Sequence, residues 1–147
     1  MKYIAYGSNL SEEQMAFRCP DARIIGKGFL EGWKLKFRYH ATIERREGSH
    51  VPVLLWEISL KDEKSLDRYE GYPDYYEKRE LKVVMTEMAE NSESEVVAMV
   101  YIMTGEGKGE SPAASYYELL SECYKRFEFD AEILKQALEE AENEDGE

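Results

Sequence analysis

The chain has 147 residues, of which 43% are hydrophobic, a length typical of one domain that buries its own core without cross-links. Its 31 acidic and 19 basic residues give a formal charge of −12, which repels phosphate backbones and anionic membrane surfaces. We therefore expect neither nucleic acid nor a membrane as a partner, whereas a homodimer stays open.

The sequence is typical of a cytoplasmic protein. Residues 1–6 are too short and too polar for a signal peptide, and no apolar run approaches the roughly 20 residues of a membrane span. Cys19 and Cys123 lie outside any CxxC pair or histidine cluster. We expect reduced thiols rather than a disulfide or a zinc site.

The chain opens with a predicted strand, tight turn and helix. Residues 2–6 are rich in aromatic and β-branched side chains, as in a strand buried on both faces, and the run stops at Gly7. Ser11 and Gln14 have the spacing of a capping box, which predicts a short helix to about Arg18.

Three more strands are predicted over residues 23–30, 33–39 and 51–58. Turn residues at 31–32 and a polar segment at 47–49 separate them. Such tight connections favour antiparallel pairing.

A short surface helix is predicted for residues 61–70. Its apolar side chains are confined to Leu66 and Tyr69, and Gly71 suits a glycine C-cap. Glu70 then lies in the last turn of this helix.

A hairpin is predicted next, because residues 76–86 and 95–103 have strand character and a polar turn at 90–93 joins them.

Two helices complete the predicted chain. Ser111 and Pro112 are typical of the N-cap and first position of a helix, and an acidic helix is predicted from about Asp130 to Glu142. We expect residues 139–147 to be a solvated helix end and frayed tail, and we assign them no function.

The order of these elements predicts an α+β fold. About six strands, mostly antiparallel and interrupted by short helices, indicate a small β-barrel or a strongly curved sheet. We expect residues 1–147 to form a single domain, with an acidic helix and tail from about residue 130.

The first candidate site is the turn after the first strand. Gly7 permits a sharp reversal, so successive N–H groups from residue 6 to residue 10 can converge on a carboxylate or a developing oxyanion. In the structural alternative, Gly7 only permits the turn and Asn9 only precedes the helix.

The second candidate is Glu70, which has Tyr69, Tyr72 and the Tyr75-Tyr76 pair close by in the sequence. Aromatic surroundings can raise the pKa of a carboxyl group by desolvation and prepare it for proton transfer. The alternative is a solvated glutamate at a helix end, and periodicity does not distinguish the two.

Other chemistry has little support in the sequence. His40 and His50 have no nucleophile or carboxylate at motif spacing, and no serine lies in a GxSxG elbow. The glycines of residues 105–109 lack the Gly-Lys-Ser/Thr of a phosphate loop, so a flexible loop is the better interpretation. The 11 tyrosines can line a pocket for a small polar ligand or fill an ordinary β core.

Two motifs occur in a fixed order, YGSNL at residues 6–10 and LDRYEG at residues 66–71. In this combination the chain resembles the gamma-glutamylcyclotransferase superfamily, whose members open with a strand ending in YGSNL and carry a later LDxxEG segment with one catalytic glutamate. Further matches, at residues 41–43, 51–58 and 76–83 among others, extend the resemblance over nearly the whole chain.

The resemblance implies a compact β-barrel with appended helices, no metal or cofactor, and conversion of a gamma-glutamyl amine or amino acid to 5-oxoproline and a free amine. Glu70 would be the catalytic residue. The residues that would bind the substrate are Tyr6, Gly7, Ser8, Asn9, Leu10, Tyr76, Tyr101 and Tyr116.

The implied chemistry needs only one carboxylate. The substrate's own α-amine attacks its γ-carbonyl, so a single glutamate can accept the proton of the attacking amine and deliver one to the leaving nitrogen. Three other functions stay open. They are a non-catalytic binding module for a small carboxylate metabolite, a structural or interaction protein whose acidic surface engages basic partners, and removal of a gamma-glutamyl protecting group from a biosynthetic intermediate.

Overall fold

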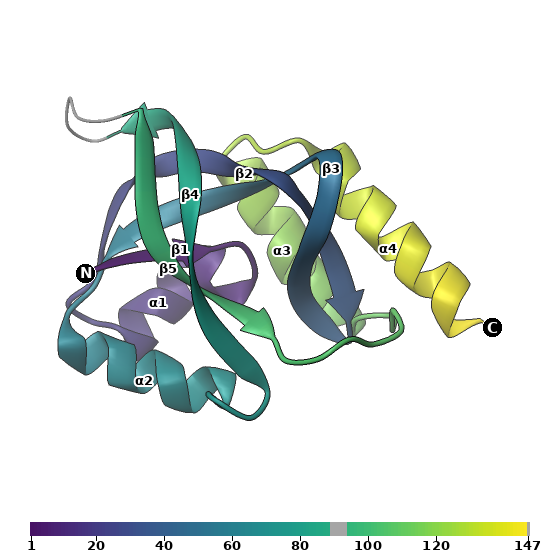
Figure 1. The fold of residues 1–147 in the computed structure, drawn as a ribbon, viewed down its shortest axis with the longest axis horizontal. Helices are drawn as coiled ribbons and strands as arrows, with labels where there is room; N and C mark the ends of the chain where they lie inside the picture. Colours follow the sequence, from purple (N-terminus) through teal and green to yellow (C-terminus); the bar gives the residue numbers. More distant parts are fainter. Residues whose placement is uncertain (89–93, 147) are drawn as a thin grey trace.

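The computed structural model describes residues 1–88 and 94–146. Within them a closed β-barrel has the strand order β1-β3-β2-β4-β5, in which β1 and β5 pair in parallel and all other neighbours are antiparallel (Figure 1). The strands are β1 (Lys2–Ala5), β2 (Arg23–Arg38), β3 (His40–Glu57), β4 (Tyr76–Met88) and β5 (Glu95–Met103). The predicted α+β barrel is confirmed.

The described residues contain five strands rather than about six, because the predicted turn at residues 31–32 is a bulge. β2 continues through it, so residues 23–30 and 33–39 do not form separate strands. Opposite the bulge, Arg45 pairs with Trp33 and His50 pairs with Glu31, so the polar segment between Arg45 and His50 bulges from β3. The chain therefore does not reverse direction at residues 31–32; the irregularity there is a bulge within the β2–β3 pair.

Four α-helices and one 3₁₀ turn surround the barrel within the described residues. They are η1 (Ser8–Leu10), α1 (Glu12–Arg18), α2 (Leu60–Glu70), α3 (Ala114–Arg126) and α4 (Ala131–Asp145). Figure 1 shows α1 beside α2 near the N-terminus, and α4 beside β2 at the other side of the molecule. The helices predicted to follow Ser11 and to end at Glu70 are both confirmed.

The start of α3 differs from the prediction. The helix begins at Ala114 with Ala113 as its N-cap residue, so Ser111 and Pro112 precede it. The Ser111 N–H instead donates a hydrogen bond to Asp145 Oδ2 over 3.0 Å, which ties this segment to the end of α4.

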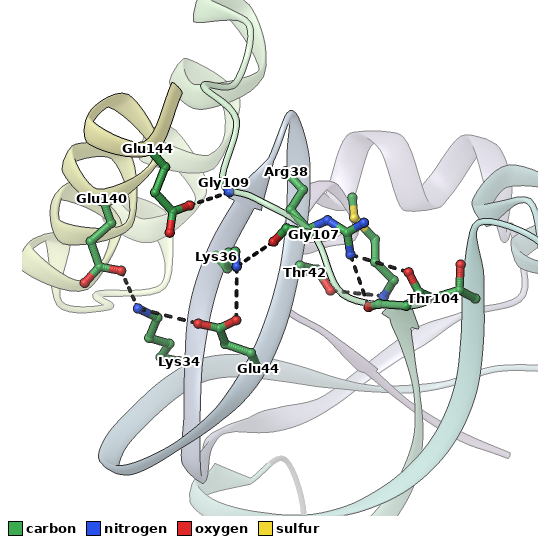
Figure 2. A network of polar contacts seen from close by, with 12 residues as sticks. Lys34, Lys36, Arg38, Thr42, Glu44, Thr104, Gly107, Gly109, Glu140 and Glu144 are labelled. Atoms are coloured by element: carbon green, nitrogen blue, oxygen red, sulfur yellow. Dashed lines mark hydrogen bonds and ion pairs between the residues drawn. The ribbon is translucent and has the colours of Figure 1, made fainter. Parts of the chain in front are cut away.

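The acidic end of the chain is also more ordered than predicted. α4 runs to Asp145 rather than to Glu142, and its carboxylates contact the rest of the molecule. Glu140 pairs with Lys34, and Glu144 accepts a hydrogen bond from the Gly109 N–H (Figure 2). The helix end is solvated as predicted, because most side chains of residues 139–146 are exposed, whereas the prediction of a frayed tail is wrong as far as Asp145.

The buried apolar side chains form one cluster inside the barrel and beneath the helices. Both cysteines are buried and free, as expected. The strands of the predicted hairpin are present, whereas its turn at 90–93 lies outside the described residues. No helix in the described ranges is long and apolar enough to cross a bilayer.

Candidate active site

A cavity of about 170 Å³ opens where β1 ends, between η1, the end of α2, the start of β3 and α3. It is well below the roughly 300–1,000 Å³ of pockets for drug-sized ligands, so it suits a small group. It brings together both segments that the sequence singles out. Its lining residues are Tyr3, Ile4, Tyr6, Gly7, Ser8, Asn9, His40, Ala41, Tyr69, Glu70, Tyr76, Tyr101 and Tyr116.

Glu70 is the last residue of α2, and Gly71 ends that helix in the left-handed conformation, with φ of 65°. A Cβ at Gly71 would also lie 2.6 Å from the Tyr75 ring. Both the left-handed backbone conformation and this close contact therefore favour glycine at this position. This sharp end places the Glu70 side chain at the cavity. Within the described residues its carboxylate has neither a hydrogen bond nor an ion pair.

Burial raises the pKa of Glu70 to about 7, and the nearby Arg18 guanidinium opposes that rise. An ordinary glutamate is ionised throughout the neutral range, whereas this one exchanges its proton near neutral pH. Glu70 is half-buried and lines the cavity, so it is not the fully solvated side chain of the structural alternative. A carboxyl group with this pKa, in a cleft and without a partner, has the properties of a general acid/base.

The aromatic enclosure of Glu70 is only partly as predicted. Tyr69 and Tyr76 line the cavity, but Tyr72 and Tyr75 are 41% and 75% exposed and do not belong to its lining. The turn that follows the end of α2 carries these two rings outward. Tyrosines distant in sequence, from β1, β5 and α3, take their place.

Of the segment predicted as a substrate cradle, Tyr6, Gly7, Ser8 and Asn9 line the cavity and Leu10 does not. The Leu10 side chain is fully buried in the core, and its N–H donates to the Gly7 carbonyl oxygen over 2.9 Å. The N–H groups that begin a helical turn have no acceptor within that turn, and in η1 these belong to Ser8 and Asn9. The wall of the cavity here is a polar backbone turn.

Gly7 lies close to side chains of two other elements. A Cβ at this position would lie 3.2 Å from the Tyr116 hydroxyl oxygen and 3.4 Å from Ala41 Cβ. Any larger residue would push against α3 or the start of β3. Gly7 thus lets η1, β3 and α3 meet at one point of the cavity wall.

Two tyrosine hydroxyls fix the part of the cavity wall around Ala41, next to Gly7. Tyr76 donates a hydrogen bond to the Ala41 carbonyl oxygen over 2.8 Å, and the Tyr116 hydroxyl accepts one from the Ala41 N–H over 3.1 Å. Both backbone groups of Ala41 are thereby satisfied by cavity tyrosines. Burial raises the pKa of Tyr76 and Tyr116 well above 10, so both stay neutral hydrogen-bonding groups at physiological pH.

The hydroxyls of Tyr6 and Tyr101 point to partners as well. Tyr6 donates to the Tyr101 carbonyl oxygen over 2.6 Å, and Tyr101 donates to Asp67 Oδ1 over 2.6 Å. Both rings line the cavity, whereas their hydroxyl hydrogens are already used. These two residues shape the site more than they offer hydrogen-bond donors to it.

The sequence does not point to four residues that line the cavity, namely Tyr3, Ile4, His40 and Ala41. His40 is a case in point: its ring packs edge-on against Tyr116, with ring centres 5.2 Å apart. No motif spacing signals this position, because the contact spans separate elements. Only the resemblance around residues 41–43 points to the segment.

The glycine-rich loop of residues 105–109 lies away from the cavity. Figure 2 shows it crossing the end of β2, where the Gly107 carbonyl oxygen accepts a hydrogen bond from Lys36 Nζ over 2.9 Å. The adjoining Glu110 pairs with Arg38 in a parallel bridge. This loop packs on the end of β2 and does not form a phosphate-binding loop.

Comparison with known proteins identifies the family of this chain. Residues 3–126 match the family described as gamma-glutamyl cyclotransferase, AIG2-like. A search of curated proteins finds no match.

Among solved structures, one named gamma-glutamyl cyclotransferase superposes with a TM-score of 0.76 at 25% identity, covering 92% of this chain and 85% of the other. An uncharacterized protein from Homo sapiens, loc79017, gives a TM-score of 0.75 at 26% identity, with the same coverage of 92% and 85%. YkqA from Bacillus subtilis shares the fold at 14% identity, with a TM-score of 0.73, and covers 97% of this chain and 54% of its own. The chain belongs to the AIG2-like gamma-glutamyl cyclotransferase family.

Proposed function

We propose that the protein converts a gamma-glutamyl amine or a gamma-glutamyl amino acid to 5-oxoproline and the free amine. The observation that carries the proposal is Glu70, a carboxylate without a partner in the described structure, with a pKa raised to about 7, which lines the same small cavity as the backbone turn at Ser8 and Asn9. The structural neighbour named gamma-glutamyl cyclotransferase supports this choice of chemistry.

Glu70 acts as base and then as acid. It accepts a proton from the substrate's α-amine as that nitrogen forms a bond to the γ-carbonyl carbon. It then gives a proton to the amine nitrogen as the bond between this nitrogen and the carbonyl carbon breaks. Glu70 accepts one proton and delivers one, so it ends in its starting state, and a pKa near the working pH suits both transfers.

The rest of the site positions the substrate. The attack closes a five-membered ring within one molecule, so holding the glutamyl chain folded back supplies a large part of the rate. The N–H groups of Ser8 and Asn9 stabilise the negative charge that develops on the γ-carbonyl oxygen. Tyr6, Tyr76, Tyr101 and Tyr116 wall the cavity, while Leu10 serves only in packing.

The test is a panel of gamma-glutamyl amines and amino acids, with release of 5-oxoproline as the readout. We expect at least one compound to be turned over by the wild-type protein and by Glu118→Gln, a control at an exposed glutamate of α3. The Glu70→Gln variant should bind the same compound without releasing product. Compounds that raise the melting temperature but yield no 5-oxoproline would contradict the proposal and favour a binding module.

A further inference from the structure

Arg18 lies at the end of α1 and contacts the cavity wall from outside. Its guanidinium carbon lies 3.5 Å from the centre of the Tyr69 ring, and its Nη1 donates a hydrogen bond to Asn9 Oδ1 over 2.7 Å. Arg18 is not among the residues that line the cavity. A planar guanidinium can stack on a ring and donate in its own plane at once, which a lysine ammonium cannot do.

These two contacts join segments that are far apart in the sequence. The Asn9 amide is held at both ends, because its oxygen accepts from Arg18 and its Nδ2 donates to the Tyr3 hydroxyl over 2.9 Å. The Tyr69 hydroxyl and Ser8 Oγ form a hydrogen bond of 2.9 Å. One guanidinium therefore links the backbone turn to the end of α2, where Tyr69 precedes the candidate base.

Arg18 also carries a charge that its surroundings do not neutralise. Among the described residues it forms no ion pair with an acidic side chain, and the carboxylate on which its charge acts is Glu70. Burial raises the pKa of Glu70, and Arg18 counteracts part of that effect. A cation beside a buried carboxylate favours its ionised form.

The other ionisable groups around Glu70 supply no permanent charge. Besides Tyr69, they are Tyr3, Tyr6, Tyr76, Tyr101, Tyr116 and His40. Burial raises the pKa values of the first five of these above the ordinary tyrosine value, so they are neutral near pH 7. His40 is the one imidazole among them.

We propose that Arg18 is a positioning residue of the site, which holds Asn9 and Tyr69 in place and stabilises the ionised form of Glu70. The effect on turnover rests on the proposed function. The effects on the ionisation of Glu70 and on the cavity wall do not, since they follow from contacts within the chain.

The charge is tested by carbon NMR titration of the Glu70 carboxyl group, assigned with Glu70→Gln, in wild type, Arg18→Gln, Arg18→Met and Arg18→Lys. We expect the two neutral variants to raise the pKa of Glu70 by about one pH unit, while the lysine variant stays within a few tenths of wild type. Arg126→Gln, at an exposed arginine that pairs with Glu12 outside the cavity, is the control and should leave that pKa unchanged. The titration needs no enzymatic activity, so its result is independent of the proposed function.

Positioning is tested by steady-state kinetics of the lysine variant, which keeps the charge but loses the stacked, in-plane geometry. We expect KM to rise about fivefold or more while the acid limb of the pH profile stays in place. An unchanged Glu70 pKa in whichever neutral variant folds would overturn the charge effect. A wild-type KM in Arg18→Lys would overturn the positioning effect.

Discussion

The cavity around Glu70 and the surface between α4 and β2 differ in how their charged side chains are paired. Between α4 and β2, charged side chains lie in pairs: Lys34 lies between Glu44 and Glu140, and Lys36 contacts Glu44 at 3.2 Å (Figure 2). In the described cavity Glu70 has none. Paired charges on a surface hold elements together, whereas a buried carboxylate without a partner costs stability and marks a candidate functional site.

The largest effect should come from removing the unpaired carboxylate. Glu70→Gln keeps the size of the side chain but cannot transfer a proton, so we expect kcat to fall by about 10²–10⁴-fold. The measurement is 5-oxoproline release with the compound that the wild type turns over best. Glu118→Gln should keep wild-type kcat, and a similar loss in that control would show that the fall is not specific to the cavity.

The same substitution should increase stability in one pH range. Because the folded-state pKa of Glu70 is raised to about 7, the folded protein binds more protons than the unfolded chain between pH about 4.5 and 7, and stability falls as pH rises through this window. Glu70→Gln removes this loss. We expect it to be more stable than wild type by about 1–3 kcal/mol above pH 7 and equal to it below pH 4.5.

Urea unfolding of both proteins at pH 4 and at pH 8 measures this difference. A constant gap between them at both pH values would show that Glu70 is not the titrating group.

A methyl group at the meeting point of the cavity walls should have a moderate effect. Gly7→Ala places a Cβ 3.2 Å from the Tyr116 hydroxyl oxygen, so we expect a loss of stability of about 1 kcal/mol and weaker substrate binding. Tyr116→Phe removes that oxygen, so the double variant should be less destabilised than the sum of the two single variants. Strict additivity in this cycle would contradict the predicted contact.

The smallest effect is expected at the paired surface. Lys34→Met breaks the contacts with Glu44 and Glu140, which are about half exposed, so the loss of unfolding free energy should stay below about 1 kcal/mol and decrease with added salt. kcat should not change. A loss of turnover comparable to that of Glu70→Gln would break the contrast between the two regions.

Local signals account for the parts of the site that the sequence predicts. Ser11 caps α1 through the Gln14 N–H, and Gly71 ends α2 in the left-handed conformation, so the positions of η1 and Glu70 follow from residues only a few places away. The resemblance then selects these two segments from many similar turns and helix ends.

Contacts between distant segments account for what the sequence does not predict. The Ala41 backbone is held by Tyr116, 75 residues away, and Ser8 Oγ shares a hydrogen bond with the hydroxyl of Tyr69, 61 residues away. The bulge at residues 31–32 and the docking of α4 have the same cause, because a Glu-Gly pair fits a turn or a bulge and an acidic helix end fits solvent or a basic strand. In each case the structure that forms depends on the segment that packs against these residues.

The central claim is that the unpaired Glu70 is the proton-transfer group, and the pH dependence of kcat/KM for 5-oxoproline release tests it most directly. The profile should rise with pH through one ionisation near 7, and that midpoint should coincide with the Glu70 pKa measured by carboxyl NMR in the free protein. A midpoint near the ordinary glutamate value of about 4.5, or one that stays in place while the Glu70 pKa moves in Arg18→Gln, would contradict the claim.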